Sequence, residues 1–279
     1  MDMLKKTIFW TLTIIITLFT AVYQRLTGPT YPKSFQVEID GTPYKYKLPR
    51  STNSTSDFDV RIKMPDNEVS GILIYKRYKV NEPLDTINLI RSGNELSAIL
   101  PGQPSAGKLE YSVAFYKNDK NLHIIGDEPV VIRFKNFVPA YVLIPHILFI
   151  FLAMLLSTLS GFFAAGNIPS YKFYTSATLI FFLIGGMILG PVVQKFAFGE
   201  FWTGIPFGQD LTDNKALIAS IFWVIAWAGN RKKDRRYLVI LAAIVNLTIG
   251  MIPHSARGSE LDYSSGEIKT GMIFLNGLF

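Results

Sequence analysis

Long apolar segments, separated by charged or turn-forming residues, constrain this chain more than any other feature of its sequence. The first segment, residues 7–23, carries no charge and directly follows Lys5 and Lys6. Four more follow, at about residues 138–162, 173–193, 215–229 and 237–253. A helix needs about 20 apolar residues to cross a bilayer, and the short fourth segment fits a thin or tilted placement. The sequence therefore predicts five transmembrane helices: an N-terminal anchor in residues 1–29 and a four-helix bundle in residues 138–253.

A cleaved signal peptide is the rival interpretation of the first segment. However, no convincing cleavage site with small residues follows it, and its apolar run is longer than the core of a usual signal peptide. We therefore expect a retained anchor.

The positions of lysine and arginine predict how the helices are oriented. The strongest basic cluster, RKKDRR at residues 231–236, lies between the fourth and fifth apolar segments. Such clusters stay in the cytoplasm, and alternation of the helices then places the N-terminus there as well. Residues 30–137 and the C-terminal tail, residues 254–279, are consequently expected on the extracytoplasmic side of a cell inner membrane. Without an extended basic surface, the cluster does not indicate a nucleic-acid partner.

Residues 30–137 have a different pattern, with short stretches that are rich in β-branched and aromatic residues and mostly alternate in polarity. About seven such stretches are separated by turn residues, which is typical of a β-sandwich. They are SFQVEID, YKYKL, DFDVRIKM, GILIYKRYKV, INLI, LEYSVAFY and VVIRF. The stretch LPGQPSAGKLEYSVAFY resembles the loop that enters a late strand of an immunoglobulin- or fibronectin-type sandwich. The resemblance is architectural, covers about a third of the chain, carries no catalytic motif, and implies a tyrosine-corner role for Tyr111. Because the chain has no cysteine, core packing alone must hold this domain.

Two of the three histidines occur in the same tripeptide, Ile-Pro-His, which ends at His146 and again at His254. The predicted topology puts both at the outer membrane face, with Asp210 in an outer loop and Glu260 and Asp262 in the tail. Imidazoles and carboxylates together can hold a divalent metal, and two histidines on different helices can be the axial ligands of a b-type haem. If they act together, we expect the two imidazoles within about 10 Å of each other.

A structural explanation of the same residues stays open. Pro145 suits the first turn of a helix, Pro253 ends one, and a histidine at a helix end can simply bond a carbonyl. Asp213 is similarly expected to be the N-cap of the fourth helix.

Recognisable catalytic motifs are missing from the sequence. It has no cysteine nucleophile, no Gly-x-Ser-x-Gly, no phosphate-binding Walker loop and no HExxH, so whether it is an enzyme stays open. The leading hypothesis is a binding or assembly subunit that sits in the lipid bilayer and contacts another envelope protein. The alternative is a metal- or haem-dependent membrane protein with its site on His146 and His254.

Overall fold

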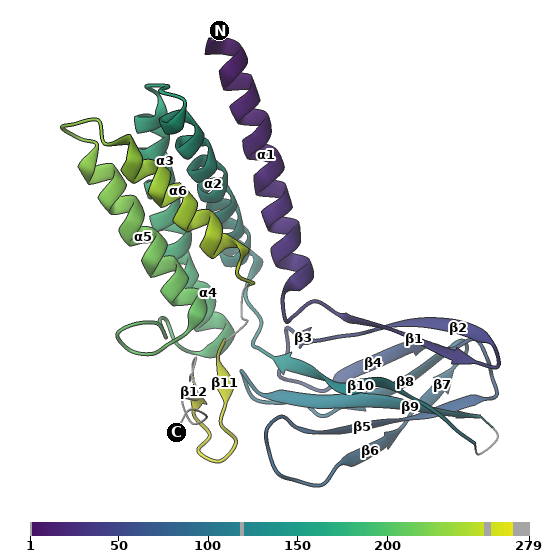
Figure 1. Cartoon of the computed structure of the whole chain (residues 1–279). Helices are drawn as coiled ribbons and strands as arrows, with labels where there is room; N and C mark the ends of the chain where they lie inside the picture. The colour runs from purple at the N-terminus through teal and green to yellow at the C-terminus, as the bar shows by residue number, and fades with distance from the viewer. Residues whose placement is uncertain (1, 118–119, 254–257, 270–279) are drawn as a thin grey trace, which may run out of the picture. The chain divides into compact units, whose positions relative to one another are not determined.

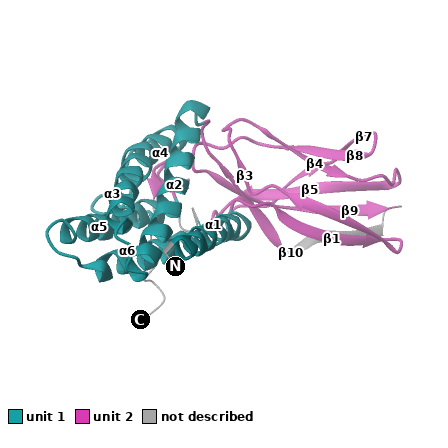
Figure 2. Cartoon of the chain, turned by 90° about the horizontal axis from the view of Figure 1, so that it is seen from above, with its two compact units in different colours: residues 1–29, 138–258, 270–279 teal, residues 30–137, 259–269 magenta. Residues whose placement is uncertain are grey.

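The structure is a computed structural model that describes residues 2–117, 120–253 and 258–269. Contacts divide the chain into two compact units (Figure 2). The helical unit comprises residues 1–29, 138–258 and 270–279, and the β unit comprises residues 30–137 and 259–269. The predicted mixture of apolar helices and β-strands is confirmed.

Figure 1 labels helices α1 to α6 of the helical unit. Their bounds are α1 (Asp2–Thr27), α2 (Ala140–Ala165), α3 (Tyr171–Phe182), the π-helical stretch η1 (Leu183–Leu189), α4 (Gly190–Phe198), α5 (Leu211–Gly229) and α6 (Arg236–Met251). Because α3, η1 and α4 follow one another without a break, the described residues form five helices.

Three of these helices are long and apolar enough to cross a membrane. They cover Met3–Thr27, Ala140–Ala165 and Tyr171–Phe198, with 25, 26 and 28 residues. At a rise of about 1.5 Å per residue each exceeds the roughly 30 Å hydrocarbon core. This indicates a membrane protein with three candidate spans among the described residues.

The other two helices, α5 and α6, lack the length or the composition that would identify them as membrane spans. Helix α6 has 16 residues and is therefore only about 24 Å long. Helix α5 has 19 residues, but Asp213, Asn214 and Lys215 occupy its first two turns. Length and composition alone therefore do not identify α5 and α6 as spans, and their crossing of the membrane stays a prediction.

Close approach of helices inside the unit depends on glycine. A Cβ atom at Gly161 of α2 would lie 2.7 Å from Cβ of Ala243 in α6, and one at Gly185 would lie 2.9 Å from Cβ of Phe149. Both separations are shorter than carbon atoms tolerate, so a side chain at either position would push the helices apart. Small residues are commonly used in this way where helices pack within membranes.

The strands of the β unit, which Figure 1 labels, form several small sheets. Their bounds are β1 (Lys33–Ile39), β2 (Thr42–Leu48), β3 (Ser51–Thr52), β4 (Phe58–Lys63), β5 (Val69–Arg77), β6 (Asp85–Asn88), β7 (Ile90–Ser92), β8 (Glu95–Leu100), β9 (Lys108–Lys117), β10 (Lys120–Phe134), β11 (Glu260–Leu261) and β12 (Ile268–Lys269). Hydrogen bonding gives the orders β3-β10-β9-β5-β6, β4-β8-β7, β1-β2 and β11-β12. Among the described residues, these sheets do not close into a single sandwich.

One apolar core nevertheless joins the first three of these sheets. It is formed by alternating residues of the strands, and its most buried large side chains include Leu48, Leu73, Leu100, Tyr111 and Phe115. The alternation of buried and exposed positions along β4, β8 and β9 follows directly from the two-residue period of a strand.

The predicted strand INLI is divided in the structure. Leu89 lies between β6 and β7, which belong to different sheets, and its backbone N–H donates to the Gly71 carbonyl at 2.8 Å. The chain thus changes sheet at a single buried leucine. The pattern of polar and apolar residues does not show where a chain changes sheet, so the sequence predicted one strand here.

Tyr111 does not form the expected tyrosine corner. Its hydroxyl donates to the Pro49 carbonyl at 2.8 Å, 62 residues earlier in the chain, whereas a corner tyrosine bonds backbone a few residues upstream. The bond therefore joins β9 to the segment that follows β2. Burial raises the pKa of this phenol.

Part of the predicted C-terminal tail packs on the β unit. Residues 259–269 contain the β11–β12 hairpin, the Leu261 N–H donates to the Ala106 carbonyl, and Arg133 donates to the Ser259 carbonyl at 2.7 Å. Residues 254–257 and 270–279 of the tail lie outside the described residues.

Candidate functional site at one end of the helical unit

His146 is held by the π-helical stretch of the third candidate span. Its Nδ1 atom lies 2.9 Å from the carbonyl oxygen of Gly185, which also accepts the N–H of Gly190. A carbonyl can only accept, so Nδ1 must carry the hydrogen. The neutral ring then has its lone pair on Nε2, the nitrogen that can accept a proton or bind a metal.

Two local features explain the π-helical stretch. Gly185 and Gly186 supply backbone without side chains where η1 meets α2. Pro191, at the start of α4, has no N–H, which removes one of the bonds that would keep the preceding turns α-helical. π-helical turns are rare and often found at functional sites. The wider turn also leaves the Gly185 carbonyl accessible to His146.

A chain of hydrogen bonds between polar groups, called the polar chain below, connects α4 to the start of α5. Gln194 donates through Nε2 to the Thr203 hydroxyl at 2.5 Å, and the Thr203 N–H donates to Asp213 Oδ2 at 2.6 Å. Asp213 is buried, and its carboxylate therefore fixes the loop between α4 and α5.

Asp210, not Asp213, is the N-cap of α5. Its Oδ1 accepts the backbone N–H of Thr212 at 2.7 Å and that of Asp213 at 3.3 Å. The prediction for Asp213 was wrong because the helix begins at Leu211, before the apolar run that marks it in the sequence.

Lys215 is a buried basic residue at this end of the unit, with a relative exposure of 7%. Its Nζ donates to the carbonyl of Ile252, the C-cap residue of α6, at 2.5 Å. A cation at a helix C-terminus is stabilised by the free carbonyls and the helix dipole. Sequence reasoning missed this role; the available signal was a lysine at the very start of an apolar segment.

The structure places the predicted ligands in different surroundings. His146 and Asp210 belong to the helical unit, whereas Glu260 and Asp262 belong to the β11–β12 hairpin of the β unit. His254 lies outside the described residues. In the described part of the chain, no group of three or more histidine or acidic side chains is arranged to hold a metal ion. The metal or haem site therefore stays a prediction that depends on His254.

Lysines already bind both hairpin carboxylates. Glu260 accepts from Lys108 at 2.6 Å and pairs with Lys79 at 2.9 Å, and Asp262 pairs with Lys269. Burial alone would raise the pKa of Glu260, but the two lysines lower it below its ordinary value. Lys269 and then Ser264 hold the pKa of Asp262 far below its usual range. Any cation would have to displace these lysines.

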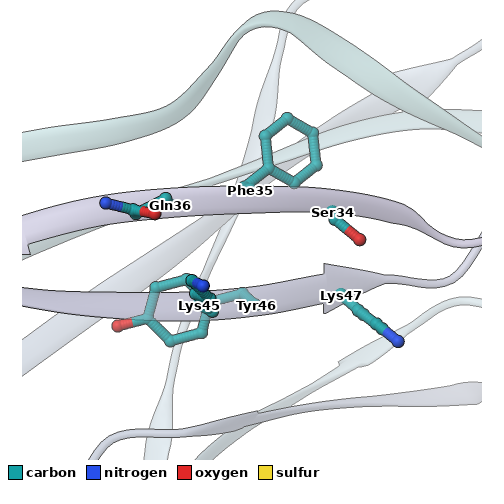
Figure 3. A pocket seen from close by; sticks show the side chains of 6 residues that line it. All are labelled: Ser34, Phe35, Gln36, Lys45, Tyr46 and Lys47. Carbon is teal, nitrogen blue, oxygen red and sulfur yellow. The ribbon is translucent and has the colours of Figure 1, made fainter.

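The β unit has an open hollow of about 530 Å³ on its β1–β2 hairpin (Figure 3). The residues that line it are Ser34, Phe35, Gln36, Lys45, Tyr46 and Lys47. These six include two lysines and no carboxylate or imidazole, so the hollow offers cationic and aromatic contacts for a ligand.

Comparison with family models, curated proteins and solved structures gave no match to this chain. The functional conclusion therefore rests on the geometry of the chain itself.

Proposed function

We propose that the protein is a binding or assembly subunit of a cell-envelope complex, embedded in the inner membrane and contacting its partner through the β unit. The observation that carries this proposal is a pair of exposed isoleucines, Ile90 and Ile99, on the outer face of the β4-β8-β7 sheet. Their exposures are 71% and 58%.

The register of the sheet makes the two isoleucines neighbours. Ile90 of β7 lies opposite Ser97 of β8, and Ile99 is two residues further along β8 on the same face. Diagonal neighbours of this kind lie about 7–8 Å apart. The adjoining positions of β4 are Asp59 and Arg61, which form an exposed ion pair.

An apolar centre with a charged border is the common pattern of a protein interface. Burial of each isoleucine by a partner would contribute up to about 1.5–3 kcal/mol to the contact.

The proposed topology has five spans, with α5 and α6 crossing the membrane beside the three long apolar helices. The basic residues 231–236 are cytoplasmic, and residues 30–137 and the C-terminal tail are extracytoplasmic. For the β unit we propose an immunoglobulin- or fibronectin-like sandwich, which is supported by the single core shared by its three main sheets.

The experiment compares two sets of substitutions in the full chain, extracted from its native membrane in mild detergent. The double variant Ile90→Ser with Ile99→Ser should release the partner. In size-exclusion chromatography it should then elute at the size of the chain alone, whereas the wild type elutes as a larger complex. Leu84→Ser is the matched control, because Leu84 is an exposed aliphatic residue of the β unit that lies outside the β4-β8-β7 sheet. An unchanged complex in the double variant would refute the proposed interface.

A metal- or haem-dependent function is the second candidate, and the Nε2 lone pair of His146 favours it. Metal content and the visible spectrum of the purified chain test it. Bound metal or a Soret band that is lost in His146→Ala and His254→Ala, but kept in His123→Ala, would support it. A chain without metal or absorbance would exclude it.

A further inference from the structure

A second hollow, of about 170 Å³, lies where α3 begins and α5 ends, at the end of the helical unit opposite the polar chain of Asp210 and Asp213. The residues that line it are Lys172, Thr175, Ser176, Trp227, Asn230 and Arg231. Neither the proposed partner contact nor the polar chain uses this site.

Asn230 gives the hollow a fixed wall. Its Nδ2 donates to the carbonyls of Ala226 and Arg235, at 2.8 and 3.1 Å, and its Oδ1 accepts the Arg235 N–H at 2.9 Å. The same Oδ1 accepts the hydroxyl of Tyr171 at 2.9 Å, which ties the turn to α3. Because Asn230 and Tyr171 are both buried, the turn is preorganised.

Positive charge dominates the rim of the hollow. The basic residues there and in the adjoining turn are Lys172, Arg231, Lys232, Lys233, Arg235 and Arg236. Asp234 is the one carboxylate of residues 230–236, and it pairs with Lys172 at 2.5 Å. That pair is largely exposed, so it contributes little to stability and an incoming anion can compete for Lys172.

Arg231 has the geometry of an anion-binding residue. Its guanidinium lies over the Trp227 ring, 4.9 Å from the ring centroid, which restricts its motion while its N–H groups stay available at the surface. A guanidinium can bind two oxygens of a phosphate at once, which an ammonium group cannot do.

Exposed apolar side chains on α3 and at the start of α6 favour a lipid over a free anion as the ligand. Phe173 and Ile180 of α3 are 69% and 56% exposed, and Tyr237 at the start of α6 is 63% exposed. In a membrane these surfaces contact acyl chains and the interfacial region. A phosphate in the hollow would therefore have its hydrocarbon chains beside α3.

We propose that this hollow binds the phosphate of an anionic phospholipid, with Arg231 and Lys172 as the phosphate ligands. Basic pockets between helices at the cytoplasmic face are a known means of binding anionic headgroups. The inference rests on the proposed membrane insertion, but not on the partner contact of the β unit.

The test uses the full chain in detergent, with native mass spectrometry to count bound phosphatidylglycerol and phosphatidylcholine. Arg231→Gln and Lys172→Gln should each weaken phosphatidylglycerol binding about tenfold, since each removes a charge-assisted hydrogen bond to the phosphate. Lys233→Gln is the control, because Lys233 is an exposed basic residue of the same turn that does not line the hollow. It should retain wild-type affinity. Phosphatidylcholine should bind more weakly than phosphatidylglycerol, because its choline ammonium is repelled by the basic residues of the rim.

Three results would overturn the proposal. Equal losses in all three variants would show general attraction to a basic surface, and no loss in Arg231→Gln and Lys172→Gln would exclude the hollow. Inorganic phosphate that competes at the concentration of the lipid would assign the hollow to a free anion. Reconstitution into vesicles of phosphatidylcholine that contain phosphatidylglycerol separates the two proposals. Failure to insert contradicts membrane embedding. Insertion without phosphatidylglycerol binding contradicts the hollow alone.

Discussion

At the scale of single residues, hydrogen bonds across long sequence distances determine what each polar group can do. The Gly185 carbonyl assigns the hydrogen of His146 to Nδ1, and the Ile252 carbonyl accepts from Lys215. Tyr111 is the equivalent case in the β unit, since its hydroxyl satisfies the Pro49 carbonyl. Each partner lies at least 37 residues away in the chain.

Tyr111→Phe should therefore destabilise the β unit. The substitution leaves the Pro49 carbonyl without its phenol donor, which costs about 1–3 kcal/mol. Hydrogen exchange of the full chain should then show protection of β9 reduced by about 5- to 150-fold.

Tyr46→Phe is the matched control, because Tyr46 is equally buried but its hydroxyl only approaches the Met64 sulfur at 4.0 Å. Its protection should change by less than about twofold. Equal effects in both variants would show that the Tyr111–Pro49 bond has no special contribution.

At the scale of elements, periodicity predicts a helix or strand well when the element has one buried face. Strands β1, β2, β4, β5 and β9 were predicted from alternation. Strand β8 was not, because its sequence ELSAIL contains residues that favour helices, although Leu96, Ala98 and Leu100 alternate inward. Pairing with β4 and β7 overrides that preference.

The β strands should fold without the helices. The core residues lie between Val37 and Phe134, so residues 30–137 contain all of the main apolar cluster. Expressed alone, this fragment should give a β-type circular dichroism spectrum and a cooperative thermal transition. A helical spectrum, or a transition without cooperativity, would contradict an independent β unit.

At the scale of the whole molecule, the sequence predicted a membrane protein with an inserted β unit more reliably than it predicted a site. Apolar length and alternation are local properties, so the three candidate spans and most strands follow from them. The polar chain from Gln194 to Asp213, the hollow at Arg231 and the packing of residues 259–269 on the β unit depend on contacts between distant segments. Local patterns do not contain that information.

In the topology proposed above, the chain crosses the membrane with its β unit and C-terminal hairpin on the extracytoplasmic side and its basic turn in the cytoplasm. Because the chain has no cysteine, single substitutions provide clean probes. The exposed positions for them are Lys45→Cys in β2, Ser265→Cys in the β11–β12 hairpin and Lys232→Cys in the basic turn.

The most direct measurement is labelling of these three variants in spheroplasts with a maleimide that cannot cross the membrane. The account predicts labelling of Lys45→Cys and Ser265→Cys in intact spheroplasts, and labelling of Lys232→Cys only after the membrane is permeabilised. Labelling of Lys232→Cys in intact spheroplasts, or protection of either of the other two, would contradict it.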